Sequence, residues 1–85
     1  MPEISRFYGI AIQMNTNDHP PPHFHACYGD EEVLVDIRNG AIYRGSLPPR
    51  AWRMVREWFA LHQAELQDNW NRARANLPMF PIAPL

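Results

Sequence analysis

Three histidines stand close together near the start of the chain, in the segment Asp18-His19-Pro20-Pro21-Pro22-His23-Phe24-His25. If residues 23–28 form a strand, His23 and His25 project from the same face, about 7 Å apart at Cα, so two imidazoles can converge on one ion or phosphate. His19 returns to complete the set, or the Asp18 carboxylate takes its place. One interpretation of this spacing is a metal site at His19, His23 and His25, for a divalent ion such as zinc with an open position for water.

Two metal-free interpretations of the same segment stand beside the metal site. In the first, His23 and His25 act as acid and base in phosphodiester cleavage, because an imidazole changes its charge near neutral pH. In the second, the prolines set a rigid turn and the imidazoles form hydrogen bonds with neighbouring backbone. Asp36 and Arg44 are expected as exposed partners of such a polar site. The spacing matches no specific metal motif and does not choose among these interpretations.

His62 is the fourth histidine, and the periodicity of the second half of the chain defines its position. At 100° per residue it lies at the middle of an apolar helical arc, with Asn69 two turns along the same line. Both side chains are expected to be buried and to find polar partners on the sheet. His62 is then either a core histidine with satisfied hydrogen bonds or a catalytic group that joins His23 and His25.

Arginine supplies all eight basic side chains, and three of them crowd the start of the expected helix. Arg50, Arg53 and Arg56 lie where the helix dipole favours anions, and with Arg44 they form a candidate site for a phosphate or an acidic partner. The alternative is a solvated helix face on which Arg53 pairs with Glu57.

Length and composition limit the classes of protein to consider. The chain has 85 residues, of which 46% are hydrophobic, so one domain over residues 1–85 with one core is expected. The net charge of −1 gives no support for nucleic-acid binding.

Cys27 is the single cysteine and is expected to be an inert small hydrophobe in a reducing compartment. No run approaches the ~20 apolar residues of a membrane span, so the expected location is the cytoplasm.

The first half of the chain has the pattern of an antiparallel sheet of about four strands. Aromatic and β-branched residues predict a strand over Ile4–Met14, followed by turn residues and the proline triplet. Gly29-Asp30 and Asn39-Gly40 mark two hairpin turns. The three strands around these turns are expected over His23–Tyr28, Glu32–Ile37 and Ala41–Arg44.

Helical periodicity begins after Ser46-Leu47-Pro48-Pro49, where proline suits the first turn of a helix. No Gly or Pro interrupts Arg50 to about Asn76, so one long amphipathic helix is expected there, packed on the sheet. Its apolar arc contains Ala51, Trp52, Val55, Trp58, Phe59, Leu66, Trp70 and Ala73. The fold class is therefore α+β.

The last segment, Leu77–Leu85, carries three prolines and is expected to be an extended tail. Its side chains include Met79, Phe80, Ile82 and Leu85, which make it too apolar to be solvated. The tail is expected to pack on its own domain or in the groove of a partner or second copy.

Eleven short segments carry a resemblance to a known family. They are Pro2–Ile10, Asn17–His19, Pro21–His25, Tyr28-Gly29, Asp36-Ile37, Leu47–Ala51, Glu57-Trp58, Leu61-His62, Glu65-Leu66, Asn69-Trp70 and Pro84-Leu85. In these the chain resembles, from end to end, the small bacterial proteins grouped as domain of unknown function 4160. His19, His23, His25 and His62 coincide with the recurring motif of that family.

The resemblance implies little firm biochemistry, since the family is named for its lack of an assigned function. Its members are suspected components of toxin–antitoxin-like pairs, encoded beside another small domain, which implies a small cognate partner protein. It supplies no catalytic residues.

Two functions of different classes agree with these observations. The first is a binding module, a component of a toxin–antitoxin-like or regulatory pair whose tail or arginine face contacts a second protein or nucleic acid. The second is a hydrolase or nuclease that uses His23 and His25 with His19 or His62, with or without a divalent metal. A purely structural assembly protein is a third interpretation.

Overall fold

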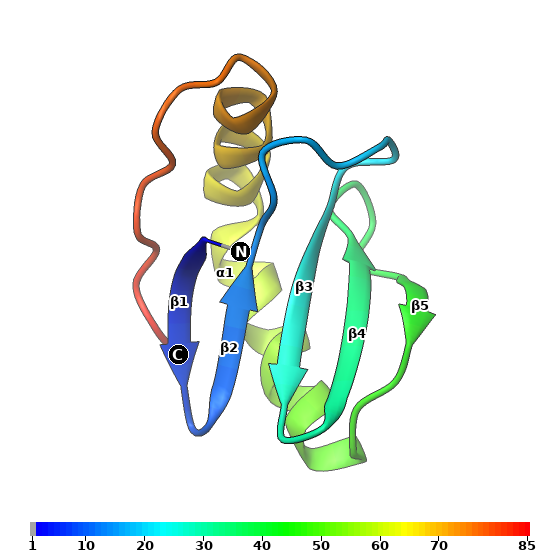
Figure 1. The fold of residues 1–85 in the computed structure, drawn as a ribbon. Coiled ribbons are helices and arrows are strands. Elements are labelled where there is room, and N and C mark those ends of the chain that lie inside the picture. Colours follow the sequence, from blue (N-terminus) through cyan, green and yellow to red (C-terminus); the bar gives the residue numbers. More distant parts are fainter. Residues whose placement is uncertain (1) are drawn as a thin grey trace.

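The computed structural model describes residues 2–85, which form a five-stranded sheet and one long helix. The strands are β1 (Glu3–Phe7), β2 (Ile10–Gln13), β3 (His23–Tyr28), β4 (Glu31–Asp36) and β5 (Ile42–Gly45), and α1 spans Pro49–Arg74. The strand order follows the sequence, and every neighbouring pair is antiparallel (Figure 1). The predicted α+β class, an antiparallel sheet with a long C-terminal helix, is confirmed.

The prediction of one strand over residues 4–14 is wrong, because the chain turns back at Tyr8 and Gly9. Both residues have positive φ, 50° and 80°, as the two central residues of a type I′ hairpin turn require. Phe7 consequently pairs with Ile10, and Tyr8 is 70% exposed at the turn. This extra turn gives the sheet five strands instead of about four.

The strands after the proline triplet lie close to their predicted positions. β3 spans the predicted residues, while β4 begins one residue earlier and β5 one residue later than expected. The glycines of the two predicted turns, Gly29 and Gly40, have φ of +59° and +74°. The Gly29-Asp30 turn joins β3, the strand that carries His23 and His25, to β4 and fixes the register in which they pair.

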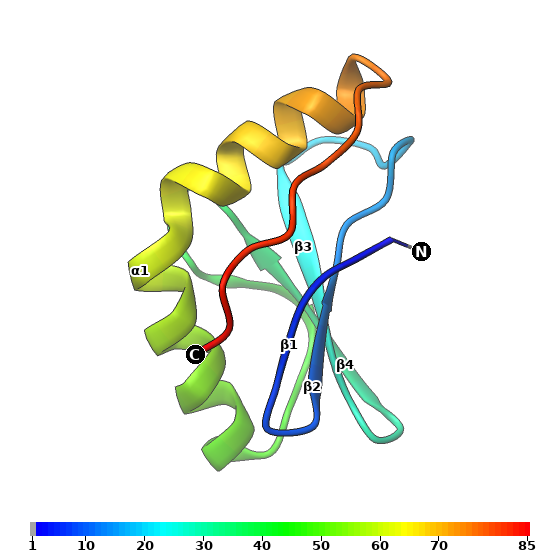
Figure 2. The same cartoon turned by 90° about the vertical axis from the view of Figure 1, so that its left-hand side faces the viewer.

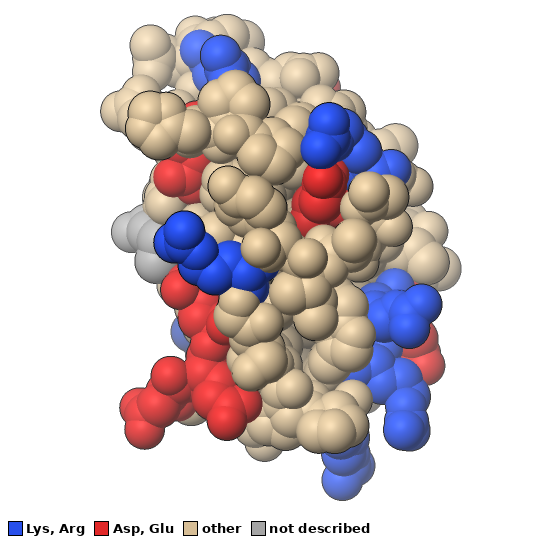
Figure 3. All heavy atoms as spheres, turned by 90° about the vertical axis from the view of Figure 1, so that its right-hand side faces the viewer, with Lys and Arg blue, Asp and Glu red and all other residues tan. Residues whose placement is uncertain are grey.

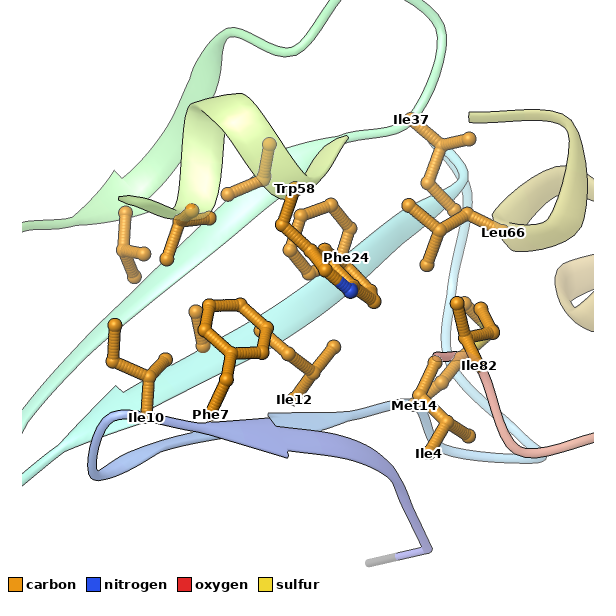
Figure 4. Packing of buried hydrophobic residues seen from close by; sticks show 14 of the residues in the cluster. Ile4, Phe7, Ile10, Ile12, Met14, Phe24, Ile37, Trp58, Leu66 and Ile82 are labelled. Atoms are coloured by element: carbon orange, nitrogen blue, oxygen red, sulfur yellow. The ribbon is translucent and has the colours of Figure 1, made fainter. Parts of the chain in front are cut away.

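The helix α1 packs across one face of the sheet (Figure 2). Its buried residues include most of the predicted arc, and Trp52 and Phe59 are partly buried beside it. Trp58 is fully buried, with its ring centroid 5.5 Å from that of Phe7 and 5.7 Å from that of Phe24 (Figure 4). The helix is kinked at His62, where φ is −129° and ψ is 21°.

The tail packs on its own domain, which is one of its two predicted positions. It runs back along β1, where the Ile82 N–H donates to the Ile4 carbonyl at 2.8 Å and the Ile82 side chain is buried (Figures 1 and 2). The Trp58 indole N–H donates to the Ala83 carbonyl at 2.8 Å. The tail therefore covers the outer edge of β1 and part of the core that α1 and the sheet leave open.

Candidate metal centre

His23 and His25 lie on the same face of β3, as strand alternation requires. Phe24 and Ala26, which alternate with them, are fully buried in the hydrophobic core. The two imidazoles emerge on the other face, with ring centroids 5.3 Å apart. They are only 5% and 9% exposed. Two polar rings are therefore held side by side in a nearly buried position, where their nitrogens need partners.

The loop between β2 and β3 covers these histidines and brings Asp18 to them. Asp18 Oδ2 lies 3.2 Å from His23 Nε2 and 3.1 Å from His25 Nε2. The Pro22 carbonyl accepts a hydrogen bond from the Ile37 N–H at 3.0 Å, which ties the end of this loop to the chain just after β4. The ligand atoms of Asp18 and the two histidines all lie within 4.8 Å of one another.

The remaining nitrogen of each ring is held by a hydrogen-bond acceptor. His23 Nδ1 lies 2.8 Å from the Pro21 carbonyl oxygen, and His25 Nδ1 lies 3.1 Å from Glu32 Oε2. Because a carbonyl and a carboxylate only accept, both Nδ1 atoms must carry hydrogen. In a neutral ring, Nε2 then presents a lone pair to the Asp18 carboxylate. Two lone pairs that face a carboxylate repel it, so a proton or a cation at Nε2 stabilises this arrangement. The Asn15 side-chain amide also lies 3.5 Å from His25 Nε2 and can donate to it.

Asp18 is ionised in this cluster. Partial burial opposes ionisation, but the hydrogen bond from His25 and the charges of His23 and His25 outweigh it and hold the pKa of Asp18 below its usual range. The Asp18 side chain is 25% exposed, more than either imidazole. The cluster is therefore an ionised oxygen beside two imidazole nitrogens, and it meets solvent at the oxygen.

Residues of other elements close the space around His23. The rings of Tyr43 and Trp70 lie 5.7 Å and 5.5 Å from the His23 ring, between centroids. Asp36, the β4 neighbour of His23, is buried at 8% exposed, contrary to the expectation of an exposed partner. The hydrogen bond from Arg38, 2.8 Å long at Nη2, lowers the pKa of Asp36. The carboxylate of Asp36 is therefore paired with Arg38 and not with His23.

His19 does not take the third position of the predicted metal set. Among residues 2–85, the group of mutually close ligand atoms contains Asp18, His23 and His25 but not His19. His19 is exposed and lines a surface pocket of about 230 Å³ together with Asp18. The third member of the cluster is therefore Asp18, the alternative ligand considered from the sequence, and not His19.

His62 lies apart from the pair on β3. Its Nδ1 is 2.6 Å from Glu65 Oε1, and its ring packs 5.5 Å from that of Trp58, between centroids. Asn69 is 1% exposed, as predicted, but its partner is the tail instead of the sheet. Its side-chain amide exchanges two hydrogen bonds of 2.9 Å with the backbone of Phe80. His62 thus contacts a residue of its own helix, and Asn69 contacts the tail.

The four arginines proposed as an anion site do not surround one pocket. Arg53 and Arg56 line a surface pocket of about 450 Å³, whereas Arg50 lines a separate one of about 670 Å³. Arg44 is exposed on β5, opposite Leu34 of β4. Figure 3 shows the basic side chains in several groups on the face seen from the β5 side.

Cys27 lies on β3 next to the cluster but is not a ligand. Burial, together with the charge and hydrogen bond of Glu32, raises the pKa of the Cys27 thiol. Its Sγ lies 3.5 Å from Glu32 Oε2 and 3.7 Å from Gln13 Oε1. The group of mutually close ligand atoms in residues 2–85 does not include this sulfur.

Residues 9–71 match the model of the family described as Domain of unknown function (DUF4160). The chain belongs to this family. The matched segment covers more than half of the chain and contains all four histidines, whereas β1 and the tail lie outside it. No curated protein and no solved structure matches the chain. Membership in DUF4160 assigns no activity, so the function has to be argued from the cluster itself.

In this DUF4160 chain, no helix of residues 2–85 combines the length and apolar character needed to cross a membrane.

Four further side chains contact His23 or His25 in this DUF4160 domain and were not assigned to the site from sequence: Asn15, Glu32, Tyr43 and Trp70. Glu32 is the one that the sequence could have identified. The β3–β4 hairpin sets Glu32 opposite Cys27, and therefore diagonal to His25 on the same face. Tyr43 and Trp70 come from β5 and α1, and their approach depends on the tertiary fold.

Proposed function

We propose that this protein binds one divalent first-row metal ion, such as Zn²⁺, through Asp18, His23 and His25, and uses it in a hydrolytic reaction. The observation that carries the proposal is the convergence of two Nε2 atoms on Asp18 Oδ2, at 3.2 Å and 3.1 Å. Both Nδ1 atoms are engaged elsewhere. Two imidazoles and a carboxylate are the donor set of catalytic zinc sites and of non-haem iron(II) sites.

Two of the three separations between the donor atoms fit a single metal ion. Donors bound 2.0–2.2 Å from one ion, at tetrahedral or octahedral angles, lie about 3.0–3.5 Å from each other. The distances from Asp18 Oδ2 to His23 Nε2 and His25 Nε2 fall in this range. The third separation, between the two Nε2 atoms, is within 4.8 Å, so the imidazoles are close enough to share an ion with Asp18 once the rings adjust.

The hydrogen bonds behind the imidazoles support the same proposal. Histidines that bind metals usually donate their other N–H to a carboxylate or a backbone carbonyl, which fixes the tautomer and the ring orientation. His23 donates to the Pro21 carbonyl and His25 to the Glu32 carboxylate. Each imidazole is thereby oriented with Nε2 towards Asp18.

The number of donors favours a catalytic role over a structural one. Three protein ligands leave a coordination position for water, and a divalent ion lowers the pKa of that water towards neutrality. The hydrophobic core is built on the other face of β3 and does not include the three donors. The domain has a core of its own, so the ion has no evident structural task.

The site thus favours the hydrolase alternative over the binding module. A small partner protein, as in a toxin–antitoxin-like or regulatory pair, stays a separate proposal. Of its two expected contact surfaces, the tail is packed on its own domain through Ile82, while Arg50, Arg53 and Arg56 are exposed.

A metal-free cluster is the competing arrangement. Two doubly protonated imidazoles would also satisfy Asp18 and Glu32, as ion pairs of 3.1–3.2 Å. Such a cluster binds no transition metal tightly, because both Nε2 lone pairs are occupied by protons.

The deciding experiment is a titration of chelator-stripped protein with Zn²⁺ and Co²⁺ near neutral pH. Calorimetry gives the affinity and stoichiometry, and the visible absorption of Co²⁺ reports its coordination. We expect one ion per chain, with binding abolished in Asp18→Asn and His25→Gln. The control variants His19→Gln and His62→Gln should bind like the wild type. Equal binding by Asp18→Asn, or no binding together with two imidazolium rings in the NMR spectrum, would refute the proposal.

A further inference from the structure

A pocket of about 230 Å³ opens beside the proposed metal site. Its lining residues are Thr16, Asn17, Asp18, His19, Pro20 and Arg74. Asp18 belongs to both places, since its carboxylate also contacts the two histidines of β3. Asp18 is more exposed than those histidines, so the cluster meets solvent at the residue that it shares with the pocket.

Arg74 brings a positive charge to this pocket from the last turn of α1. Its guanidinium carbon lies 6.0 Å from the centroid of the Trp70 ring, and Trp70 in turn packs on His23. Three other arginines in residues 2–85 form ion pairs with carboxylates, whereas no carboxylate lies within 4 Å of the Arg74 guanidinium. Its N–H donors are therefore available to a ligand in the pocket.

The charge of the pocket depends on the metal. Without an ion, the Asp18 carboxylate offsets the Arg74 charge and repels an anion. A divalent ion on Asp18, His23 and His25 adds two positive charges at the same end of the pocket. An anion would then lie between two sources of positive charge, the ion on one side and the guanidinium on the other.

Resting on the proposed metal site, we propose that this pocket binds the phosphoryl group of a phosphate ester. The planar Arg74 fork takes two phosphoryl oxygens, and a third oxygen occupies the open metal position. A carboxylate has only two oxygens, so it cannot give two to the guanidinium and a third to the metal. The His19 side chain, which also lines the pocket, offers an N–H to the bridging ester oxygen.

The size of the pocket indicates how much of the substrate it encloses. Pockets that bury a drug-sized molecule measure about 300–1,000 Å³. At about 230 Å³, this one holds the phosphoryl group and leaves most of the esterified group in solvent. Recognition is then centred on the phosphoryl oxygens.

The test uses inorganic phosphate as the probe and the full-length chain loaded with one Co²⁺ or Zn²⁺, with excess metal removed. Calorimetry measures phosphate binding, and Co²⁺ absorption reports separately that the metal is in place. The variants are Arg74→Gln, Arg74→Lys and the matched control Arg53→Gln, which removes an arginine of the same helix at another pocket. Acetate is the comparison anion.

We expect phosphate to bind the metal-loaded wild type and to bind about tenfold or more weakly after Arg74→Gln, after metal removal, or when replaced by acetate. Arg74→Lys should retain part of the affinity, and Arg53→Gln should change nothing. Intact Co²⁺ binding without phosphate binding, or equal losses in Arg74→Gln and Arg53→Gln, overturns this inference and leaves the metal site standing. Failure of the chain to take up metal contradicts the metal site itself, and tight phosphate binding to the metal-free chain overturns the inference.

Discussion

Asp18 and Glu32 hold the two nitrogens of the same imidazole ring. Asp18 Oδ2 lies 3.1 Å from His25 Nε2, and Glu32 Oε2 lies 3.1 Å from His25 Nδ1. Asp18 would share the proposed metal ion with His25, and Glu32 orients the ring through a hydrogen bond to Nδ1. This division of roles between two acidic residues is the basis of the proposed function, and it can be tested one residue at a time.

Glu32→Ala should weaken metal binding without abolishing it. The His25 Nδ1–H loses its acceptor, so ring orientation and ligand basicity suffer, and the expected loss of affinity is about 10–100-fold. A Co²⁺ titration measures it. The neighbouring Glu31→Ala removes an equally charged, exposed side chain whose register partner is Tyr28, and it should leave the affinity within about twofold. If the two variants lose equal affinity, the hydrogen bond from His25 to Glu32 has no specific role in metal binding, and only the negative charge matters.

Metal should raise the melting temperature of the wild type. An ion that binds only the folded chain at 100 times its Kd adds about 2.7 kcal/mol, which is about 10 °C or more for a domain of this size. Differential scanning fluorimetry with Zn²⁺ and then with excess chelator measures the shift and its reversal. His25→Gln should melt at the same temperature with and without Zn²⁺, and a shift that persists in this variant would place the ion elsewhere.

Much of the fold follows from local sequence patterns. The glycine turns and the alternation from His23 to Tyr28 predict β3 and its neighbours, and the uninterrupted period after Pro49 predicts α1. The first hairpin is missed because its turn contains Tyr8, a bulky residue that rarely adopts positive φ, in place of the usual Asn or Asp. The side chains on both sides of that turn are apolar, so composition alone does not mark a break.

The sequence predicts the geometry of the candidate site only for residues that lie on the same strand or helix. Strand alternation places His23 and His25 on one face, but the choice between Asp18 and His19 depends on the path of a proline-rich loop. His62 has the right position on an ideal helix, yet the helix is kinked at this residue and its Nδ1 contacts Glu65 of the same helix. Loop path and helix bending are tertiary properties.

Asn69→Ala should destabilise the domain by about 1–3 kcal/mol. The substitution removes both hydrogen bonds between the buried amide and the Phe80 backbone, and so weakens the attachment of the tail to α1. Urea denaturation followed by tryptophan fluorescence measures the change in the free energy of unfolding. Asn71→Ala, at an exposed position two residues along the helix, is the control and should stay within about 0.5 kcal/mol of the wild type.

Ile82→Ala should cost about 2–4 kcal/mol of stability, because the side chain is 4% exposed and fills the space between β1 and α1 (Figure 4). Leu77→Ala, at a tail residue that is 52% exposed, should have a small effect in the same urea experiment. If both variants unfold like the wild type, the tail is not part of the core in solution.

The most direct test of the central claim is the crystal structure of Zn²⁺-loaded protein, with anomalous differences measured on both sides of the zinc absorption edge. We expect one peak per chain, about 2.0–2.2 Å from His23 Nε2, His25 Nε2 and an oxygen of Asp18. The Nδ1 contacts with the Pro21 carbonyl and Glu32 should be retained. A structure in which Asp18 still contacts both imidazoles directly, with no zinc peak between them, would contradict the account.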